Sequence, residues 1–230
     1  KMCQNLTGKL TGSLGDILLA GRTTVPALAL TIVLTLSACG PPSGETANLA
    51  DPWSRGRLSF HPESKHDSSP GTFAHGLHPV FPDKPDDALV YAPASAAKKT
   101  KAPLLLLLHG AGGSGARIIR AFTDPADQLG MIVVAPKSVG ATWDVMNGPI
   151  GPDVVNIDRV LTRISHDYNI DPTRISIAGF SDGATYALAL GRLNGTLFRN
   201  IAAFSPGVLI PIDPRGSPPI FISHGTRDTI

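Results

Sequence analysis

The chain has 230 residues, of which 42% are hydrophobic and 17% are charged. This composition is typical of a globular domain and not of a disordered chain. Its 20 basic and 18 acidic residues nearly balance, and no basic stripe interleaved with aromatic residues is present, so nucleic acid is not an expected partner. The only cysteines are Cys3 and Cys39, which excludes a disulfide framework or a thiolate metal site inside the domain.

An uncharged, mostly apolar run spans residues 25–38, directly after a segment that contains Arg22. As a helix it would rise roughly 21 Å. Because this is less than the hydrocarbon core of about 30 Å, a secretory signal is favoured over a permanent span. The end of the run, Leu36-Ser37-Ala38-Cys39, resembles a bacterial lipobox, which implies cleavage before Cys39 and lipidation of its thiol. A plain secretory signal with an incidental cysteine is the alternative.

These features divide the chain into three parts. Residues 1–38 are interpreted as a lipoprotein-type signal peptide, residues 39–52 as a flexible Pro/Gly/Ser tether, and residues 53–230 as the folded domain. We therefore expect an exported protein of the bacterial cell envelope, anchored to the outer membrane or cell surface through lipid on Cys39.

The first part of the domain is polar and contains scattered histidines. Four of them lie between Trp53 and Val80, namely His61, His66, His75 and His78. No carboxylate or further imidazole stands at regular ligand spacing, so surface histidines are favoured over a metal site. Residues 57–61 and 88–93 are short and bounded by proline, which predicts two edge strands.

A continuous apolar run, Leu104–Leu108, predicts a central strand that is buried on both faces. The glycine-rich loop that follows, residues 109–115, could bind a phosphate or present backbone amides to an oxyanion. It lacks the lysine and hydroxyl residue of a P-loop. A dinucleotide site needs an acidic residue after the next strand, but residues 131–137 end in Lys137. The oxyanion interpretation is the one that remains.

Strands and helices then alternate along the chain. Amphipathic spacing predicts helices over residues 116–129 and 153–168, and apolar runs predict strands over 131–137, 201–206 and 219–226. This order predicts an α/β fold with a mostly parallel, doubly wound sheet. Trp143 lies in a loop, where it either lines an acyl pocket or packs in the core.

Residues 174–190 combine a short strand, the sequence Gly-Phe-Ser-Asp-Gly and an alanine-rich helix start. The pattern G-x-S-x-G between a strand and a helix is typical of a nucleophile elbow, whose tight turn explains Gly179 and Gly183. Ser181 is therefore the candidate nucleophile at the carboxyl edge of the sheet. An incidental glycine-rich turn is the alternative.

An acidic residue, Asp228, follows the last predicted strand. An acid past the carboxyl edge of a strand downstream of the nucleophile is the expected position for the acid of a Ser, Asp, His triad. The alternative is a surface aspartate in a turn.

Four segments together resemble the α/β-hydrolase superfamily, and more narrowly its phospholipase/carboxylesterase branch with feruloyl-esterase and polyhydroxyalkanoate-depolymerase relatives. They are residues 108–112, 169–174, 179–183 and 224–228. The resemblance implies an α/β-hydrolase fold with helices on both faces of the sheet. It also implies that Ser181 is the nucleophile, that Asp228 is the acid, and that the amides of Ala111 and Asp182 form the oxyanion hole.

The same resemblance places a catalytic histidine after the acid, beyond Ile230, so we expect the sequence to be a C-terminally truncated fragment without the last helix and strand and nearly inactive as given. The predicted activity is hydrolysis of small-molecule or polymeric carboxylic esters through an acyl-enzyme, with no cofactor or metal. A catalytically inactive, lipid-anchored binding protein with the same fold is the alternative.

Overall fold

The computed structural model describes residues 54–62, 74–97 and 101–228, which all fall within one of two units, Thr46–Ile230. The predicted signal peptide, the tether and Cys39 lie outside the described residues, and so does His66. No helix in the described ranges has the length and apolar character needed to cross a membrane.

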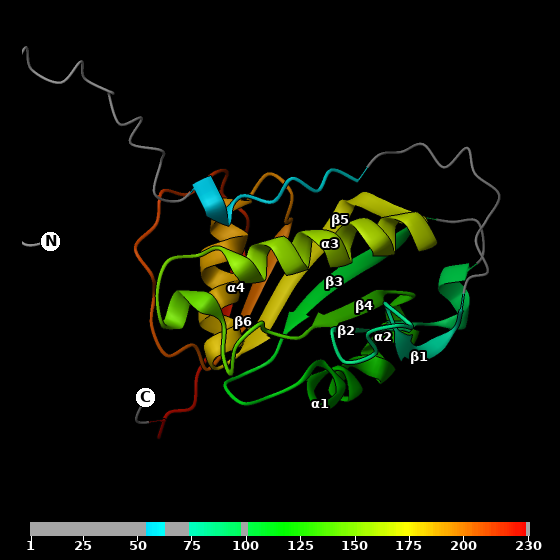
Figure 1. Ribbon diagram of the computed structural model, residues 1–230, viewed down its shortest axis with the longest axis horizontal. Helices are drawn as coiled ribbons and strands as arrows, with labels where there is room; N and C mark the ends of the chain where they lie inside the picture. Colours follow the sequence, from blue (N-terminus) through cyan, green and yellow to red (C-terminus); the bar gives the residue numbers. More distant parts are fainter. Residues whose placement is uncertain (1–53, 63–73, 98–100, 229–230) are drawn as a thin grey trace, which may run out of the picture. The chain divides into compact units, whose positions relative to one another are not determined.

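Seven strands in the described ranges form one mixed sheet in the order β1-β2-β4-β3-β5-β6-β7 (Figure 1). The last five of this order are parallel to one another, whereas β1 and β2 are antiparallel to their neighbours. The strands are β1 (Gly76–Pro79), β2 (Ala88–Ala92), β3 (Ala102–Leu108), β4 (Ile132–Pro136), β5 (Ile170–Phe180), β6 (Asn200–Phe204) and β7 (Ile220–Ser223). The predicted mostly parallel α/β sheet is confirmed.

Helices cover both faces of this sheet (Figure 1). One face packs against α3 (Pro152–Asp167) and α4 (Asp182–Leu193), and the other against α1 (Gly115–Ile119) and α2 (Thr123–Leu129). Short 3-10 turns are η1 (Ser54–Gly56), η2 (Ala94–Ala97), η3 (Arg120–Phe122) and η4 (Asp144–Met146). The single helix expected over residues 116–129 is thus broken into α1, η3 and α2, and it ends at Gly130 in the left-handed conformation, φ 59°.

The central strand β3 shows why the apolar run needs no polar face. Leu104, Leu106 and Leu108 belong to the core that packs against α3 and α4, whereas Leu105 and Leu107 belong to the core that packs against α1 and α2. Successive side chains of a strand point to opposite faces, so a strand covered on both sides is apolar at every position. Each buried leucine stabilises the fold by about 1.5–3 kcal/mol.

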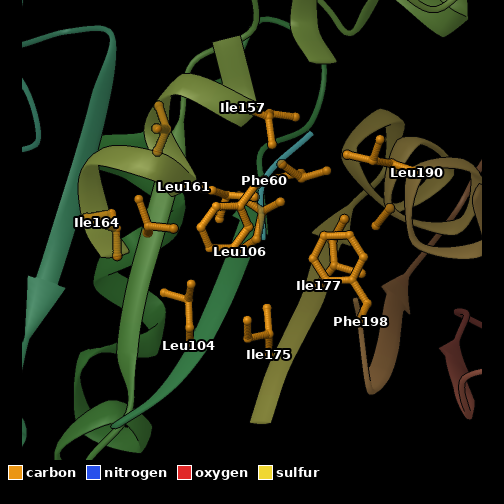
Figure 2. Close-up of a cluster of buried hydrophobic side chains, with 14 of the residues drawn as sticks. Phe60, Leu104, Leu106, Ile157, Leu161, Ile164, Ile175, Ile177, Leu190 and Phe198 are labelled. Carbon is orange, nitrogen blue, oxygen red and sulfur yellow. The ribbon is translucent and has the colours of Figure 1, made fainter. Parts of the chain in front are cut away.

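The predicted stripe of α3 packs on the first of these cores. Val154, Ile157, Val160, Leu161 and Ile164 are all buried, with exposures of at most 3%. Figure 2 shows Ile157, Leu161 and Ile164 directed toward Leu104 and Leu106 of the sheet. This packing fixes α3, and with it the loop that precedes its first residue.

Two strand predictions need correction at the N-terminal side. Residues 57–61 form no strand, because side chains take the backbone amides that a ladder would use: Asn194 accepts from Leu58, and Asp158 accepts from Phe60. Strand β2 forms as predicted but lies inside the sheet, between β4 and the unexpected edge strand β1.

The first residues of β5, directly before the apolar part of the elbow strand, do not pair regularly. The pairing of β5 with β3 is interrupted between Ile170 and Ile175. Asp171 accepts from the amide of Thr173 and from Arg174, so the segment bulges out as a turn within the strand.

Candidate active site

The residue with the most unusual backbone in the predicted elbow is Ser181, at φ 53° and ψ −122° between β5 and α4. A non-glycine residue with positive φ is strained, and such strain persists only where neighbouring contacts hold it. The amide of Ser181 donates to the carbonyl of Phe204 at 2.9 Å, and its own carbonyl accepts from Ala184 and Thr185. The neighbouring strand β6 and the following helix α4 therefore hold the serine at the carboxyl edge of the sheet.

The two flanking glycines are required by close backbone approaches. A Cβ atom at position 179 would lie 2.1 Å from the carbonyl oxygen of Gly183, and one at position 183 would lie 2.3 Å from that of Leu108. Real Cβ atoms do not approach backbone so closely, and neither contact is with a flexible side chain. The reason given by the sequence pattern for Gly179 and Gly183 therefore agrees with the geometry.

The glycine-rich loop lies directly against the elbow. A Cβ atom built on Gly110 would be 3.2 Å from the Cβ of Ser181. Next to this contact, the amides of Ala111 and Asp182 have no hydrogen-bond acceptor among the described residues. Asp182 is the first residue of α4, where helical geometry leaves the amide without an intrahelical partner. Both amides are thus available at the place where the sequence predicts an oxyanion hole.

A buried histidine, His109, holds the glycine-rich loop in place. The residue is 2% exposed, and its Nε2 accepts a hydrogen bond from the amide of Ser138 at 3.1 Å. Since Nε2 is an acceptor, Nδ1 carries the proton and donates to the carbonyl of Gly110 at 2.8 Å. Burial lowers the pKa of His109 below its ordinary value, which favours this neutral form.

Two carboxylates hold the loop of residues 137–151, which contacts His109 through the amide of Ser138. Asp153 is 1% exposed and accepts from the amides of Val139 and Asp144, both at 2.7 Å. Asp144 in return accepts from the amides of Gly151 and Asp153, at the start of α3. Burial raises the pKa of Asp153, and these backbone amides oppose that change by stabilising its charged form. This pair of aspartates was not recognised in the sequence, where Asp153 after Gly151-Pro152 at a predicted helix start was the available signal.

The same loop also contacts the elbow itself. Thr142 donates from its hydroxyl to the carboxylate of Asp182 at 2.5 Å, and Trp143 donates from its ring to the carbonyl of His109 at 2.7 Å. Trp143 is fully buried and stacks on Tyr186 of α4 at a centroid distance of 5.2 Å. Of the two interpretations of Trp143, the packing role is therefore the correct one.

The predicted acid lies at a more open part of the sheet edge. Asp228 ends a turn in which its amide donates to Gly225, and its carboxylate lies 3.6 Å from Nδ1 of His224. Nε2 of His224 lies 3.2 Å from the carbonyl of Pro206. His224 thus contacts Asp228 and the segment after β6, and no histidine among the described residues hydrogen-bonds the hydroxyl of Ser181.

Other polar groups in the described ranges form no metal site. No group of three or more histidine, cysteine, aspartate or glutamate side chains there has suitable geometry. A cavity of about 330 Å³ lies between β1, β2 and the end of α3, where His78 Nε2 and the Tyr168 hydroxyl are 2.9 Å apart. It is at the opposite end of β5 from Ser181, so it is separate from the elbow.

A strained serine in a tight turn between a parallel strand and a helix, packed against a glycine-rich loop, places the protein in the class of α/β hydrolases. Comparison with known proteins gives the family. The chain belongs to the Esterase family, whose model matches residues 84–218.

Among curated relatives, the chain is 30% identical over 152 residues to the bifunctional acetylxylan esterase/xylanase XynS20E of Neocallimastix patriciarum. This alignment covers 63% of the chain but only 22% of that relative. A solved structure, the phospholipase/carboxylesterase of Dyadobacter fermentans, superposes with a TM-score of 0.50 at 25% identity. The superposition covers 63% of this chain and 74% of the Dyadobacter fermentans chain, in agreement with the α/β-hydrolase fold.

Proposed function

We propose that the protein is a serine hydrolase that cleaves carboxylic esters through an acyl-enzyme. The hydroxyl of Ser181 attacks the ester carbonyl, and the amides of Ala111 and Asp182 stabilise the oxyanion that forms. The general base is a histidine that, by the resemblance, follows Asp228 in the chain, and Asp228 orients its ring. Membership of an esterase family favours this activity over the catalytically inactive alternative.

The observation that carries the proposal is the backbone of Ser181. Its positive φ is maintained by hydrogen bonds from both neighbouring elements, and the two flanking glycines leave space for that turn alone. Strain of this kind has a cost of order 1–3 kcal/mol and is common at catalytic positions.

The test is turnover of short-chain p-nitrophenyl esters by the full-length protein. Ser181→Ala should reduce kcat by about 10⁴-fold or more, with an unchanged melting temperature. Ser176→Ala, at a partly buried position of β5, the strand that ends just before Ser181, is the matched control and should keep full activity. Unchanged turnover in Ser181→Ala would reject the mechanism. Acetylated xylan is a suitable first polymer, because one relative is named an acetylxylan esterase.

We also propose that the protein is exported and anchored in the bacterial cell envelope by lipid on Cys39. The apolar run that ends at this cysteine supports the proposal. Growth of expressing cells with a labelled fatty acid should label the protein, and Cys39→Ser should abolish the label. Cys3→Ser, which lies before the apolar run, should leave it unchanged. Equal labelling of both variants would contradict the assignment.

A further inference from the structure

A cavity of about 290 Å³ begins next to Ser181, between the glycine-rich loop and the end of β5. Gly110 and Ala111 line it on the side of the predicted oxyanion hole. Phe180, which is 52% exposed, and Ile118 of α1 supply its apolar surface. Because a Cβ on Gly110 would lie 3.2 Å from Ser181 and 3.4 Å from the Phe180 ring, the cavity and the serine share one wall. One substituent of an ester held at Ser181 would enter this space.

Among the described residues, Arg117 is the one charged side chain that lines this cavity. The other ionisable lining residue, His109, is buried, and both of its ring nitrogens are hydrogen-bonded inside the protein. Arg117 is exposed on α1, and within the described residues its guanidinium has no ion pair and no hydrogen bond. No carboxylate from the described ranges lines the cavity. An arginine without a partner therefore borders an apolar space beside the candidate nucleophile.

We propose that Arg117 determines substrate specificity by binding a carboxylate on the ester. The preferred substrate combines an apolar group, which packs on Phe180 and Ile118, with a carboxylate that reaches the guanidinium. Arginine presents paired N–H donors that match the two oxygens of a carboxylate. The inference rests on the proposed hydrolysis at Ser181 and names the substrate class of that site.

The carboxylate can belong to either side of the scissile bond, and two pairs of esters distinguish the sources. For the acyl side, p-nitrophenyl hydrogen adipate is compared with p-nitrophenyl hexanoate. For the leaving-group side, p-carboxyphenyl butyrate is compared with p-carbamoylphenyl butyrate. In each pair the members have similar shape and differ in charge, so the ratio of their kcat/KM values isolates the contribution of the carboxylate.

Arg117→Gln should lower this charged-to-neutral ratio three- to tenfold in one of the two pairs, and Arg117→Glu should lower it further. Arg120→Gln removes the same charge one turn later, outside the cavity lining, and should leave both ratios unchanged. Added salt should reduce the ratio in the wild type but not in Arg117→Gln, because ions screen the contact.

The assignment is overturned if Arg117→Gln leaves both ratios unchanged, or if Arg120→Gln has the same effect. Circular dichroism of each variant verifies that the fold is intact. Failure of the proposed function gives a different result, namely that Ser181→Ala still turns over all four esters at the wild-type rate.

Discussion

The nucleophile side and the acid side of the candidate site are held in very different ways. Around Ser181, His109, Ser138 and Trp143 are buried, Thr142 and Asp182 are half-buried, and hydrogen bonds connect these residues across the loops. Around Asp228, every residue of β7 is exposed, including Phe221 at 58% and Ile222 at 55%. Within the described residues, the hydrogen-bonded surroundings of Ser181 indicate that changes on the nucleophile side affect stability and activity together.

The largest expected effect is a loss of activity without a matching loss of stability, on substitution of Asp228. Asp228→Asn keeps the size of the side chain but removes the charge that would orient the catalytic imidazole, so kcat should fall by about 10⁴-fold. Asparagine keeps the turn hydrogen bond from the amide of residue 228 to Gly225 and loses only the charge that faces His224, so the free energy of unfolding should change by about 1 kcal/mol or less. Ester turnover and urea denaturation measure the two effects.

An equal loss of stability in Asp228→Asn would show that the acid side is as tightly built as the elbow. Asp213→Asn is the matched control, since Asp213 is an exposed aspartate in the segment before β7. It should change neither quantity.

The second prediction compares Gly179, on the nucleophile side, with Gly225, on the acid side. Gly179→Ala places a Cβ 2.1 Å from the carbonyl oxygen of Gly183, and the backbone must move to relieve the clash. We expect a loss of at least about 2–3 kcal/mol of stability, together with loss of activity because Ser181 is displaced. Gly225→Ala meets no atom closer than 3.6 Å, so it should stay within about 0.5 kcal/mol of the wild type.

Thermal and urea denaturation of the two variants, beside ester turnover, give the comparison directly. A Gly179→Ala protein as stable as Gly225→Ala would mean that the elbow tolerates a side chain. The explanation given for the G-x-S-x-G glycines would then be wrong.

Local patterns in the sequence predicted the parts of the structure that depend on short stretches of chain. The apolar run of β3, the stripe of α3 and Gly179, whose close contact is with Gly183, each have a cause within about a dozen residues. The loop that supports the elbow has none. Thr142 bonds Asp182, 40 residues away, and Ser138 bonds His109, 29 residues away. Such pairings depend on how the strands are ordered, which no single segment specifies.

The same limit explains the strand that was predicted over residues 57–61 and does not form. Its apolar and polar residues alternate as in an edge strand. Asp158 of α3 and Asn194 after α4 nevertheless lie close enough in the fold to accept from its amides. Tertiary contacts from residues about 100 and 136 positions away override the local preference.

The smallest expected effect concerns His109, which joins the glycine-rich loop to the 137–151 loop. Burial lowers its pKa below the ordinary value of 6.5, so below that pH the unfolded chain binds a proton more readily than the folded chain. The stability that the neutral ring contributes is therefore complete above about pH 6.5 and is lost as the pH falls toward the folded-state pKa. His109 contributes at most about 1.4 kcal/mol per pH unit to the pH dependence of the free energy of unfolding, because it binds one proton.

His109→Gln removes that titration, so its free energy of unfolding should fall less steeply with acidification than that of the wild type between about pH 8 and 5. The variant should also be less stable at neutral pH by about 1–3 kcal/mol, because the buried amide of Ser138 loses its acceptor. His166→Gln is the matched control: its ring is 75% exposed at the end of α3, and its stability at neutral pH should stay near that of the wild type. If His109→Gln and the wild type have parallel pH profiles, His109 does not hold the loop as a neutral ring. The contrast between a rigid nucleophile side and an open acid side would then have to rest on the elbow glycines and the aspartate pair alone.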